Sequence, residues 1–232
     1  MLSFPDGFTA VVVGAKGALA NAFATHLESD SRCGRVIRLG RSTEPPLDLL
    51  DEASIMAAAG HLAELGPLHL VIDATGVLHG QGFAPEKAIT QIDPDAAARV
   101  FAINATGPIL ILKHLLPLMP REGKAAFATL SARVGSISDN QLGGWYAYRA
   151  SKAALNMLLK TAAIEIARKR PDAVCLALHP GTVATPLSAP YAGTRKVFTP
   201  EESADRLLAV IDGADAAQSG TFRAYDGTEI PW

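Results

Sequence analysis

A tyrosine and a lysine stand four residues apart, as Tyr148 and Lys152, in the alanine- and leucine-rich segment "GGWYAYRASKAALNMLLK". Residues with this spacing lie on one face of a helix, so a phenol and an ammonium would be side by side. A phenol with its ordinary pKa near ~10 exchanges protons poorly at neutral pH, and a nearby positive charge lowers that pKa because it stabilises the phenolate. The pair is therefore a candidate for proton transfer, with Tyr148 as the general acid or base.

The first apolar run of the chain ends in a turn with two glycines, "VVVGAKGALANAF". Gly14 permits a tight turn, and Gly17 lets the backbone approach a phosphate group. A helix that begins at Ala18 and Leu19 would direct its first N–H groups at the same anion. Because Ala20 stands where a third glycine would allow the closest helix packing, a plain strand-to-helix turn is the alternative to a dinucleotide site.

The second apolar run ends in "VIRLGRST", without the acid that would bind the ribose 2′-hydroxyl of NAD. Arg41 would instead hold a 2′-phosphate through two hydrogen bonds, with Ser42 donating beside it and Lys16 adding a second positive charge. The alternative is that Arg41 and Lys16 are solvated surface charges. These residue types favour NADP, used as NADPH, over NADH.

The elements that must position these residues alternate along the chain. Short apolar runs at "TAVVVG", "RVIRLG", "LHLVIDATG", "AAFATLS" and "AVCLALHPG" are separated by segments with helical spacing at 18–29, 51–64, 95–118 and 148–169. Strands that are apolar on both faces and alternate with helices form a parallel sheet covered on both sides. The sequence predicts a doubly wound α/β fold in one domain, residues 1–232, with its ligand site at the carboxyl ends of the strands.

Composition excludes several classes of function. The net charge is −2 and the basic residues are dispersed, which gives no footprint for nucleic acid or an anionic membrane. Cys33 and Cys175 lack metal-ligand spacing, so we expect no metal. The apolar stretch 100–112 falls short of the ~18 residues that a membrane span requires. We expect a soluble, cytoplasmic protein, also because no basic segment precedes the first apolar run.

Six features follow one another along nearly the whole chain: the glycine turn, "DATG", Asn104 in "FAINATGP", the serines of "LSARVGS", Tyr148 with Lys152, and "HPGTVATP". In this order they resemble the short-chain dehydrogenase/reductase family, and within it the small sniffer-like and C-factor-like carbonyl reductases. The resemblance implies a Rossmann-type domain that transfers a hydride from NADPH to a small carbonyl compound, an aldehyde, ketone or diketone, and yields an alcohol.

The resemblance also assigns roles to individual residues. Asn104, Ser131, Tyr148 and Lys152 would form the catalytic group, in which Lys152 also hydrogen-bonds the nicotinamide ribose. Asn104 would kink its helix and hold a water molecule; a helix-capping or backbone-bonded asparagine is the alternative. The other implied cofactor contacts are Asp48, Leu49, Ala74, Thr75, Gly76, Pro180, Gly181, Val183 and Thr185.

The strand-end serines depart from the family pattern, which reads Ser-Ser-x-x-Gly. When Gly135 is matched to the family glycine, Ala132 stands where the second serine would polarise the substrate carbonyl. We select Ser131 for this role because it sits at the strand end. Ser136 is the alternative, and we otherwise place it on the substrate side.

The connection after the second strand is also unusual. Only "STEPPL" separates Arg41 from Asp48, which is too short for the helix that joins strands two and three in the family. This unit is therefore truncated to a turn and at most a very short third strand. Asp48 and Leu49 keep the family's place beside the adenine ring.

The segment 186–199, "PLSAPYAGTRKVFT", would cover the substrate, and its brevity suits small carbonyl compounds. Leu187 and Tyr191 are expected to contact the substrate from it. Trp145 and Tyr146 would line the substrate entrance, with packing in the core as the alternative.

The helix that carries the tyrosine–lysine pair is apolar around most of its circumference from Ala153 to Ala167. One face covers the sheet, and we expect a second copy of the chain to cover the other, in a homodimer or homotetramer. A monomer is the alternative, because alanine leaves little exposed apolar area. A dinucleotide-binding regulator without turnover is the second functional hypothesis, and Tyr148 with Lys152 opposes a third, a Rossmann-like methyltransferase.

Overall fold

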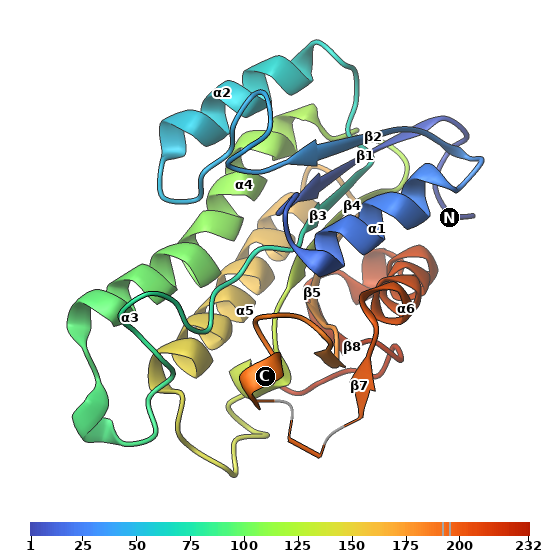
Figure 1. Cartoon of the computed structure of the whole chain (residues 1–232). Helices are drawn as coiled ribbons and strands as arrows, with labels where there is room; N and C mark the ends of the chain where they lie inside the picture. The colour runs from blue at the N-terminus through green and yellow to red at the C-terminus, as the bar shows by residue number, and fades with distance from the viewer. Residues whose placement is uncertain (192, 195) are drawn as a thin grey trace.

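The computed structural model describes residues 1–191, 193–194 and 196–232, and its centre is a six-stranded sheet (Figure 1). The strand order is β2-β1-β3-β4-β5-β8, and every neighbouring pair is parallel. A separate two-stranded pair, β6-β7, lies beside it. The strands are β1 (Phe8–Val13), β2 (Cys33–Leu39), β3 (Leu70–Asp73), β4 (Ala125–Leu130), β5 (Ala173–His179), β6 (Thr182–Val183), β7 (Val197–Phe198) and β8 (Thr221–Ala224).

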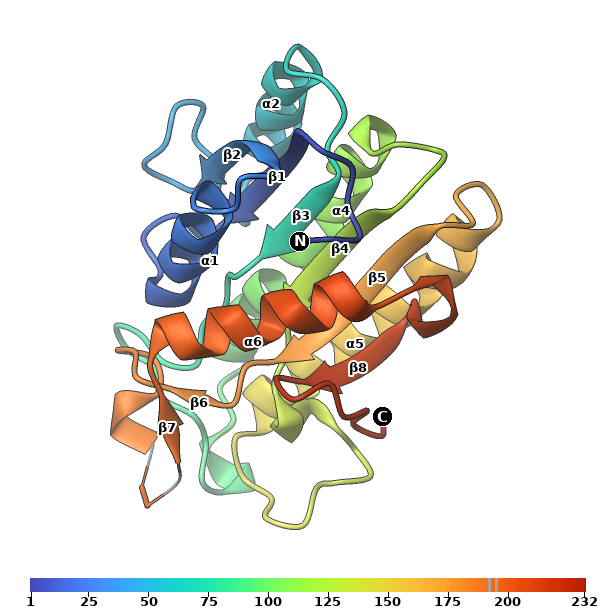
Figure 2. The same ribbon diagram turned by 90° about the vertical axis from the view of Figure 1, so that its right-hand side faces the viewer.

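Helices cover both faces of the sheet. Figures 1 and 2 show α1 and α6 on one side and α2, α4 and α5 on the other. The helices are α1 (Ala18–Glu28), α2 (Glu52–Ala63), α3 (Pro94–Phe101), α4 (Gly107–Leu115), α5 (Tyr146–Ala167) and α6 (Pro200–Gly213). The predicted doubly wound α/β fold is confirmed, and the helical segments begin and end within about two residues of the predicted ones.

Alternate residues of each strand face the two helical layers. In β1, Val11 and Val13 belong to the core cluster that includes α2, α4 and α5, whereas Ala10 and Val12 belong to the cluster with α1 and α6. Every residue of β1 and β3 is buried. Strands that are buried at every position, and mainly apolar on both faces, are typical of a sheet covered on both sides.

The chain between β2 and α2 is short, as the sequence predicts. Residues 40–51, all of which the structure describes, contain no helix or strand, and the N–H of Leu47 donates to the Gly40 carbonyl at 3.0 Å to close the turn. Leu47 is buried in the core cluster with α2. No third strand forms at Asp48 and Leu49, so β2 is the edge of the sheet.

A run of helical turns extends from α3 through α4 to residue 118 and includes a π-helical turn at Ala102–Thr106. The carboxylate of Asp93 caps its start by accepting a hydrogen bond from the Ala96 N–H at 2.7 Å. The expectation that this stretch is too short for a membrane span is wrong for the whole run, because Pro94–Leu118 is long and apolar enough to cross a membrane. One such helix is weak evidence, since core helices meet the same criteria, and 44% of its apolar window is buried inside the fold. The run packs on α2 and α5 as a core helix does.

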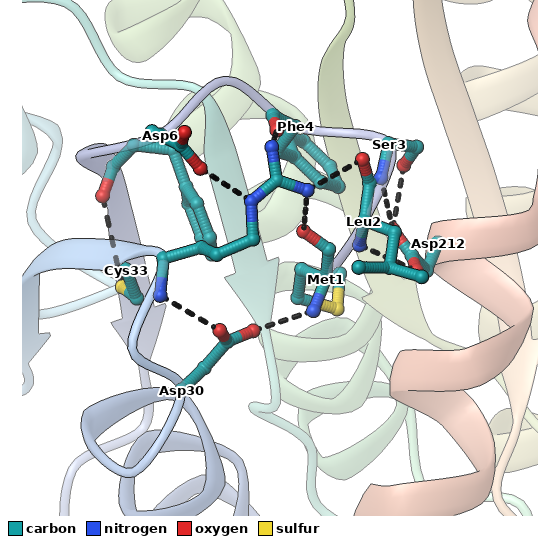
Figure 3. A network of polar contacts seen from close by, with 10 residues as sticks. Met1, Leu2, Ser3, Phe4, Asp6, Asp30, Cys33 and Asp212 are labelled. Atoms are coloured by element: carbon teal, nitrogen blue, oxygen red, sulfur yellow. Dashed lines mark hydrogen bonds and ion pairs between the residues drawn. The ribbon is translucent and has the colours of Figure 1, made fainter.

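Polar contacts fix the N-terminal segment to two distant elements (Figure 3). The guanidinium of Arg32 donates to the carbonyls of Leu2 at 2.7 Å and Phe4 at 2.8 Å, and it pairs with Asp6. Asp212, near the end of α6, accepts a hydrogen bond from the Leu2 N–H at 2.8 Å. These contacts hold the Phe4 ring in the core between α1 and α6.

Candidate active site

A cavity of about 580 Å³ opens at the carboxyl ends of β1, β3, β4 and β5, where a doubly wound sheet collects its ligands. Its walls come from the turn after β1, the loop after β3, the end of β4, the start of α5 and the segment after β5. The predicted site residues in these walls are Lys16, Gly17, Ala18, Leu19, Ala74, Thr75, Gly76, Ser131, Trp145, Tyr148, Lys152, Pro180, Gly181, Val183, Thr185, Leu187 and Tyr191. Residues 192 and 195 of the expected substrate cover lie outside the described residues.

The turn between β1 and α1 leaves the first N–H groups of α1 without a side-chain cap. Gly14 has a φ of +108°, and a Cβ there would lie 3.3 Å from the carbonyl of Ala74. Gly17 is the N-cap, and its N–H donates to the Gly14 carbonyl at 2.7 Å. Free N–H groups at the start of a helix attract an anion, so this turn fits a phosphate group.

Tyr148 and Lys152 lie one turn apart on α5, and both are buried in the cavity wall. The Lys152 ammonium donates to the carbonyl of Leu130, at the end of β4, at 2.7 Å. Burial lowers the pKa of Lys152 to about 8, and the charge of Asp73 opposes this shift. Burial raises the pKa of Tyr148 to about 12. The expectation that Lys152 lowers the pKa of Tyr148 is therefore wrong for this structure, because desolvation of the phenol dominates.

Asn104 lies in the π-helical turn and is fully buried. Its Oδ1 accepts the Val77 N–H at 2.8 Å, and its Nδ2 donates to the Val77 carbonyl at 2.8 Å and to the Ser151 hydroxyl at 3.2 Å. A Cβ on Gly76 would lie 3.5 Å from both Asn104 Oδ1 and Lys152 Nζ. Asn104 is thus backbone-bonded, and it ties the loop after β3 to α5 next to the lysine.

Asp73, which we did not include among the site residues, organises the end of β3. Its Oδ1 accepts hydrogen bonds from the Thr75 N–H at 3.1 Å and the Thr75 hydroxyl at 2.6 Å, and its Oδ2 accepts one from the Thr129 hydroxyl at 2.6 Å. Burial raises the pKa of Asp73, and these hydrogen bonds oppose the shift. The turn at 74–76, which forms cavity wall, is fixed by this carboxylate. An Asp two residues before a Thr at a strand end is the sequence signal of such a turn.

The two candidate serines occupy different places. Ser131 lies in the cavity wall, and its hydroxyl donates to Asn156 Oδ1 at 2.7 Å. Ser136 is buried away from the cavity, and its Oγ accepts the Asp139 N–H at 3.1 Å. The tight turn after β4 thus leaves Ser136 outside the cavity walls that the described residues form, and its place on the substrate side stays a prediction. Ala132 is in the wall next to Ser131.

Aromatic side chains form one end of the cavity. The Trp145 ring lies edge-on to the rings of Tyr148 and Tyr191, with centroids 6.2 and 5.2 Å away. Tyr146 is 38% exposed and is absent from the cavity walls that the described residues form. Tyr146 points away from Tyr148, since residues two apart on a helix point in nearly opposite directions, and its place at the substrate entrance stays a prediction.

Some of the predicted cofactor residues lie outside the cavity walls: Gly14, Arg41, Ser42, Asp48 and Leu49. Arg41 is exposed just after β2, and a Cβ on the preceding Gly40 would lie 3.2 Å from the backbone nitrogen of Ala15. The loop with Arg41 therefore contacts the glycine turn, on the side of that turn that does not line the cavity. Asp48 accepts the Leu50 N–H at 3.0 Å, and Leu49 packs against the core, so neither enters the cavity.

The loop between β4 and α5 supplies wall residues that sequence reasoning missed. They have no regular spacing, because the loop is irregular, and no motif marks them. They are Arg133, Val134, Asp139, Gln141 and Leu142; Arg149, in the first turns of α5, is a further wall residue that sequence reasoning missed. His179, at the end of β5, also lines the cavity; its Nδ1 accepts the Arg133 N–H at 3.4 Å, and burial lowers its pKa to about 4, so the imidazole is neutral at pH 7.

The strand order, the phosphate-type turn and the buried tyrosine–lysine pair on one cavity define a Rossmann-type oxidoreductase. A family model described as short chain dehydrogenase matches residues 6–196. The chain belongs to this family, whose members bind a nicotinamide dinucleotide.

Individual relatives agree with this membership. The chain is 33% identical over 234 residues to 1-hydroxy-2-glutathionyl-2-methyl-3-butene dehydrogenase of Rhodococcus sp. (strain AD45), covering 97% of this chain and 99% of that protein. It is 37% identical over 168 residues to C-signal of Myxococcus xanthus, covering 72% of this chain and 94% of that protein. An NADPH-bound carbonyl reductase from chicken fatty liver has a similar structure, with a TM-score of 0.86, 26% identity and coverage of 99% and 96%. Carbonyl reductase Sniffer of D. melanogaster shares the fold at 22% identity, with a TM-score of 0.83 over 97% and 99% of the two chains.

Proposed function

We propose that this protein is an NADPH-dependent reductase of small carbonyl compounds. The observation that carries the proposal is that Tyr148, Lys152 and the uncapped start of α1 line the same cavity. The residues present fit the cofactor: the glycine turn offers free N–H groups to a diphosphate, and the Lys152 ammonium is available one helical turn from the phenol.

Bound NADPH would supply a hydride to the carbonyl carbon of the substrate. Tyr148 would donate its phenolic proton to the carbonyl oxygen, and a pKa raised to about 12 keeps that proton on the phenol until reduction begins. Lys152 would hold the ribose by a hydrogen bond and stabilise the phenolate that Tyr148 becomes before solvent returns the proton. Asn104 would position Lys152 through Gly76 and Ser151.

Two basic residues support the choice of NADPH over NADH. Lys16 is in the cavity wall, and Arg41 is exposed where its loop touches the glycine turn. A guanidinium in that position suits a 2′-phosphate, and no acid stands there to hold a free 2′-hydroxyl. The similar carbonyl reductase from chicken fatty liver binds NADPH, as its description states.

The size and chemistry of the cavity support a small substrate. About 580 Å³ must accommodate the nicotinamide end of the cofactor as well as the substrate. Trp145, Tyr191 and Leu187 make the far end apolar, so the carbonyl group would be the main polar feature of the substrate that is recognised there. Aldehydes, ketones and diketones with a modest apolar group meet these conditions.

Steady-state oxidation of NADPH with a panel of small aldehydes, ketones and diketones tests the proposal. We expect consumption of NADPH with at least one class of carbonyl compound. The panel should include, with NADP⁺, a glutathionyl alcohol, because the relative in Rhodococcus is named for such a substrate. Tight NADPH binding without turnover in either direction would contradict a reductase.

A dinucleotide-binding regulator is the second candidate, and one observation favours it. Ala132 faces the cavity without a hydroxyl, while the Ser131 hydroxyl is donated to Asn156. If the Ser131 hydroxyl keeps its hydrogen bond to Asn156, no serine hydroxyl is free to polarise the substrate carbonyl. Turnover that falls in Ser131→Ala and is unaffected in Ser136→Ala supports the reductase; equal and negligible turnover in all three proteins supports the regulator.

We also propose a homodimer formed through α5, with a homotetramer as the larger assembly. Met157, Leu158 and Ile164 on this helix are 67%, 40% and 54% exposed, and a second copy would cover these apolar side chains. Light scattering at micromolar concentration should give at least twice the mass of the chain, and Ile164→Glu should give a monomer. Met56→Glu, at an equally exposed site on α2, is the control; a monomeric unmodified protein contradicts the proposal.

A further inference from the structure

A left-handed turn presents Trp145 to the cavity. Gly143, Gly144 and Trp145 have φ values of +64°, +66° and +53° in succession. Glycine adopts this conformation freely, but a bulky aromatic residue is strained in it and stays there only when its surroundings hold it. Because Trp145 contacts Tyr148 and Tyr191, the strained residue lies where the proposed substrate binds.

α5 begins at this turn without a cap of its own. Trp145 is the N-cap residue and makes no side-chain capping hydrogen bond, and the first turn of α5 contains no acid. Tyr148 is the third residue of the helix, within the turn that frays most readily when its N–H groups are unpaired. The catalytic phenol therefore depends on whatever satisfies the start of α5.

Glu86, from a distant part of the chain, both holds the strained turn at Trp145 and caps the start of α5. It is only 8% exposed although most of its neighbours in the loop 79–92 are exposed. Its carboxylate oxygens accept the Ala147 N–H at 3.4 and 3.3 Å, and its carbonyl accepts the Trp145 N–H. A negative charge at the start of a helix is also favoured by the helix dipole.

Arg149 holds the other side of the same turn. Its Nε donates to the Gly144 carbonyl at 2.9 Å, and its own N–H donates to the Trp145 carbonyl at 2.8 Å. Glu86 therefore binds the Trp145 N–H group of the turn, and Arg149 binds the carbonyls of Gly144 and Trp145. Arg149 belongs to α5 itself and also donates from Nη1 to the Val134 carbonyl, in the turn after β4, at 3.3 Å. Glu86 connects the turn to a different part of the fold, the loop after β3.

We propose that Glu86 is a positioning residue, which caps α5 in place of a local residue and holds Trp145 and Tyr148 in the geometry that reduction requires. This inference rests on the proposed reductase function. Glu86 lies outside the cavity walls formed by the described residues, so it acts through the two aromatic side chains and does not touch substrate or cofactor. It does not contribute to the phosphate-binding turn, which belongs to α1.

The test compares Glu86→Gln with Glu86→Met. The two side chains have similar size, but only the amide of glutamine retains an oxygen that accepts the Ala147 N–H. We expect Glu86→Met to lower kcat roughly tenfold, the effect of one lost hydrogen bond at a buried group, while NADPH affinity is unchanged. Glu86→Gln should retain most of kcat. Glu122→Ala, in the exposed loop before β4 and so at the end of the sheet opposite to the cavity, is the control.

A second readout needs no turnover. In a Trp232→Phe background Trp145 is the only tryptophan, so its emission reports the turn directly. Acrylamide should quench Trp145 more strongly in Glu86→Met than in Glu86→Gln. Equal quenching, or a kcat that Glu86→Met leaves unchanged, overturns the proposal. If Glu86→Met does not fold, Glu86→Ala carries the same expectations; if the unmodified protein shows no turnover, the reductase function fails and quenching alone decides the role of Glu86.

Discussion

Gly135 is the residue whose substitution should test most sharply how α5 is positioned. It lies in the tight turn after β4 and packs directly against the helix. A Cβ at Gly135 would lie 2.7 Å from Lys152 Cβ and 3.0 Å from the Lys152 carbonyl carbon. These atoms belong to the helix backbone and the root of a side chain, so they cannot rotate away. In Gly135→Ala the turn and the helix must therefore separate.

The size of the effect follows from this overlap. Carbon atoms pack at ~3.5–4.0 Å, so a methyl group at 2.7 Å requires a displacement of roughly 1 Å. A misplacement of about 1 Å in a catalytic arrangement costs on the order of 10²-fold in rate. Overpacking of a core contact also costs about 1–3 kcal/mol of stability. We expect Gly135→Ala to lower kcat/KM by about two orders of magnitude in a protein that still folds.

The assay is steady-state NADPH oxidation, with urea unfolding to measure stability. Gly60→Ala is the control: Gly60 lies inside α2, and a Cβ there meets nothing within 4 Å. We expect it to leave kcat/KM unchanged and to stabilise the protein by about 1 kcal/mol, because alanine favours a helix over glycine. Normal kcat/KM in Gly135→Ala would refute the argument that this contact sets the place of Lys152.

Three further predictions concern the cofactor, pH and stability. Arg41→Ala should remove most of the preference for NADPH over NADH, about 10- to 100-fold in the ratio of dissociation constants, since a charge-assisted hydrogen bond is worth ~1.5–3 kcal/mol; equal affinities in the unmodified protein would contradict this. kcat/KM for NADPH should fall as pH rises above about 8, because the pKa of Lys152 is lowered to about 8 and only its ammonium form holds the ribose and stabilises the phenolate. Lys152→Arg should move this fall to higher pH. Arg32→Ala should destabilise the protein by about 2 kcal/mol in urea unfolding through loss of its hydrogen bonds to the N-terminal segment, whereas Arg121→Ala, at an exposed site, should have no effect.

Local signals made the fold and the glycine turn predictable. Strand runs that are mainly apolar on both faces indicated a sheet covered on both sides, and the four-residue spacing placed Tyr148 and Lys152 on one face of α5. The glycine turn is similarly local, because Gly14 and Gly17 act through their own backbone geometry. Each of these inferences depends only on residues close together in sequence.

The substrate side of the site was harder to predict because long-range contacts shape it. Glu86 reaches α5 across 61 residues, and nothing in its own neighbourhood marks it as a helix cap. Ser136 seemed suited to the substrate on sequence alone, yet the turn after β4 directs it elsewhere. The predicted direction of the pKa shift of Tyr148 is wrong, because burial of the phenol, which the local sequence does not reveal, raises that pKa.

The most direct test of the central claim is the turnover of Tyr148→Phe measured together with its affinity for NADPH. This change removes the phenolic oxygen and leaves the ring that packs on Trp145. We predict that kcat falls by ~10²–10⁴-fold, the usual contribution of a general acid, while the dissociation constant of NADPH stays the same. Turnover close to that of the unmodified protein would contradict the assignment of Tyr148 as the proton donor.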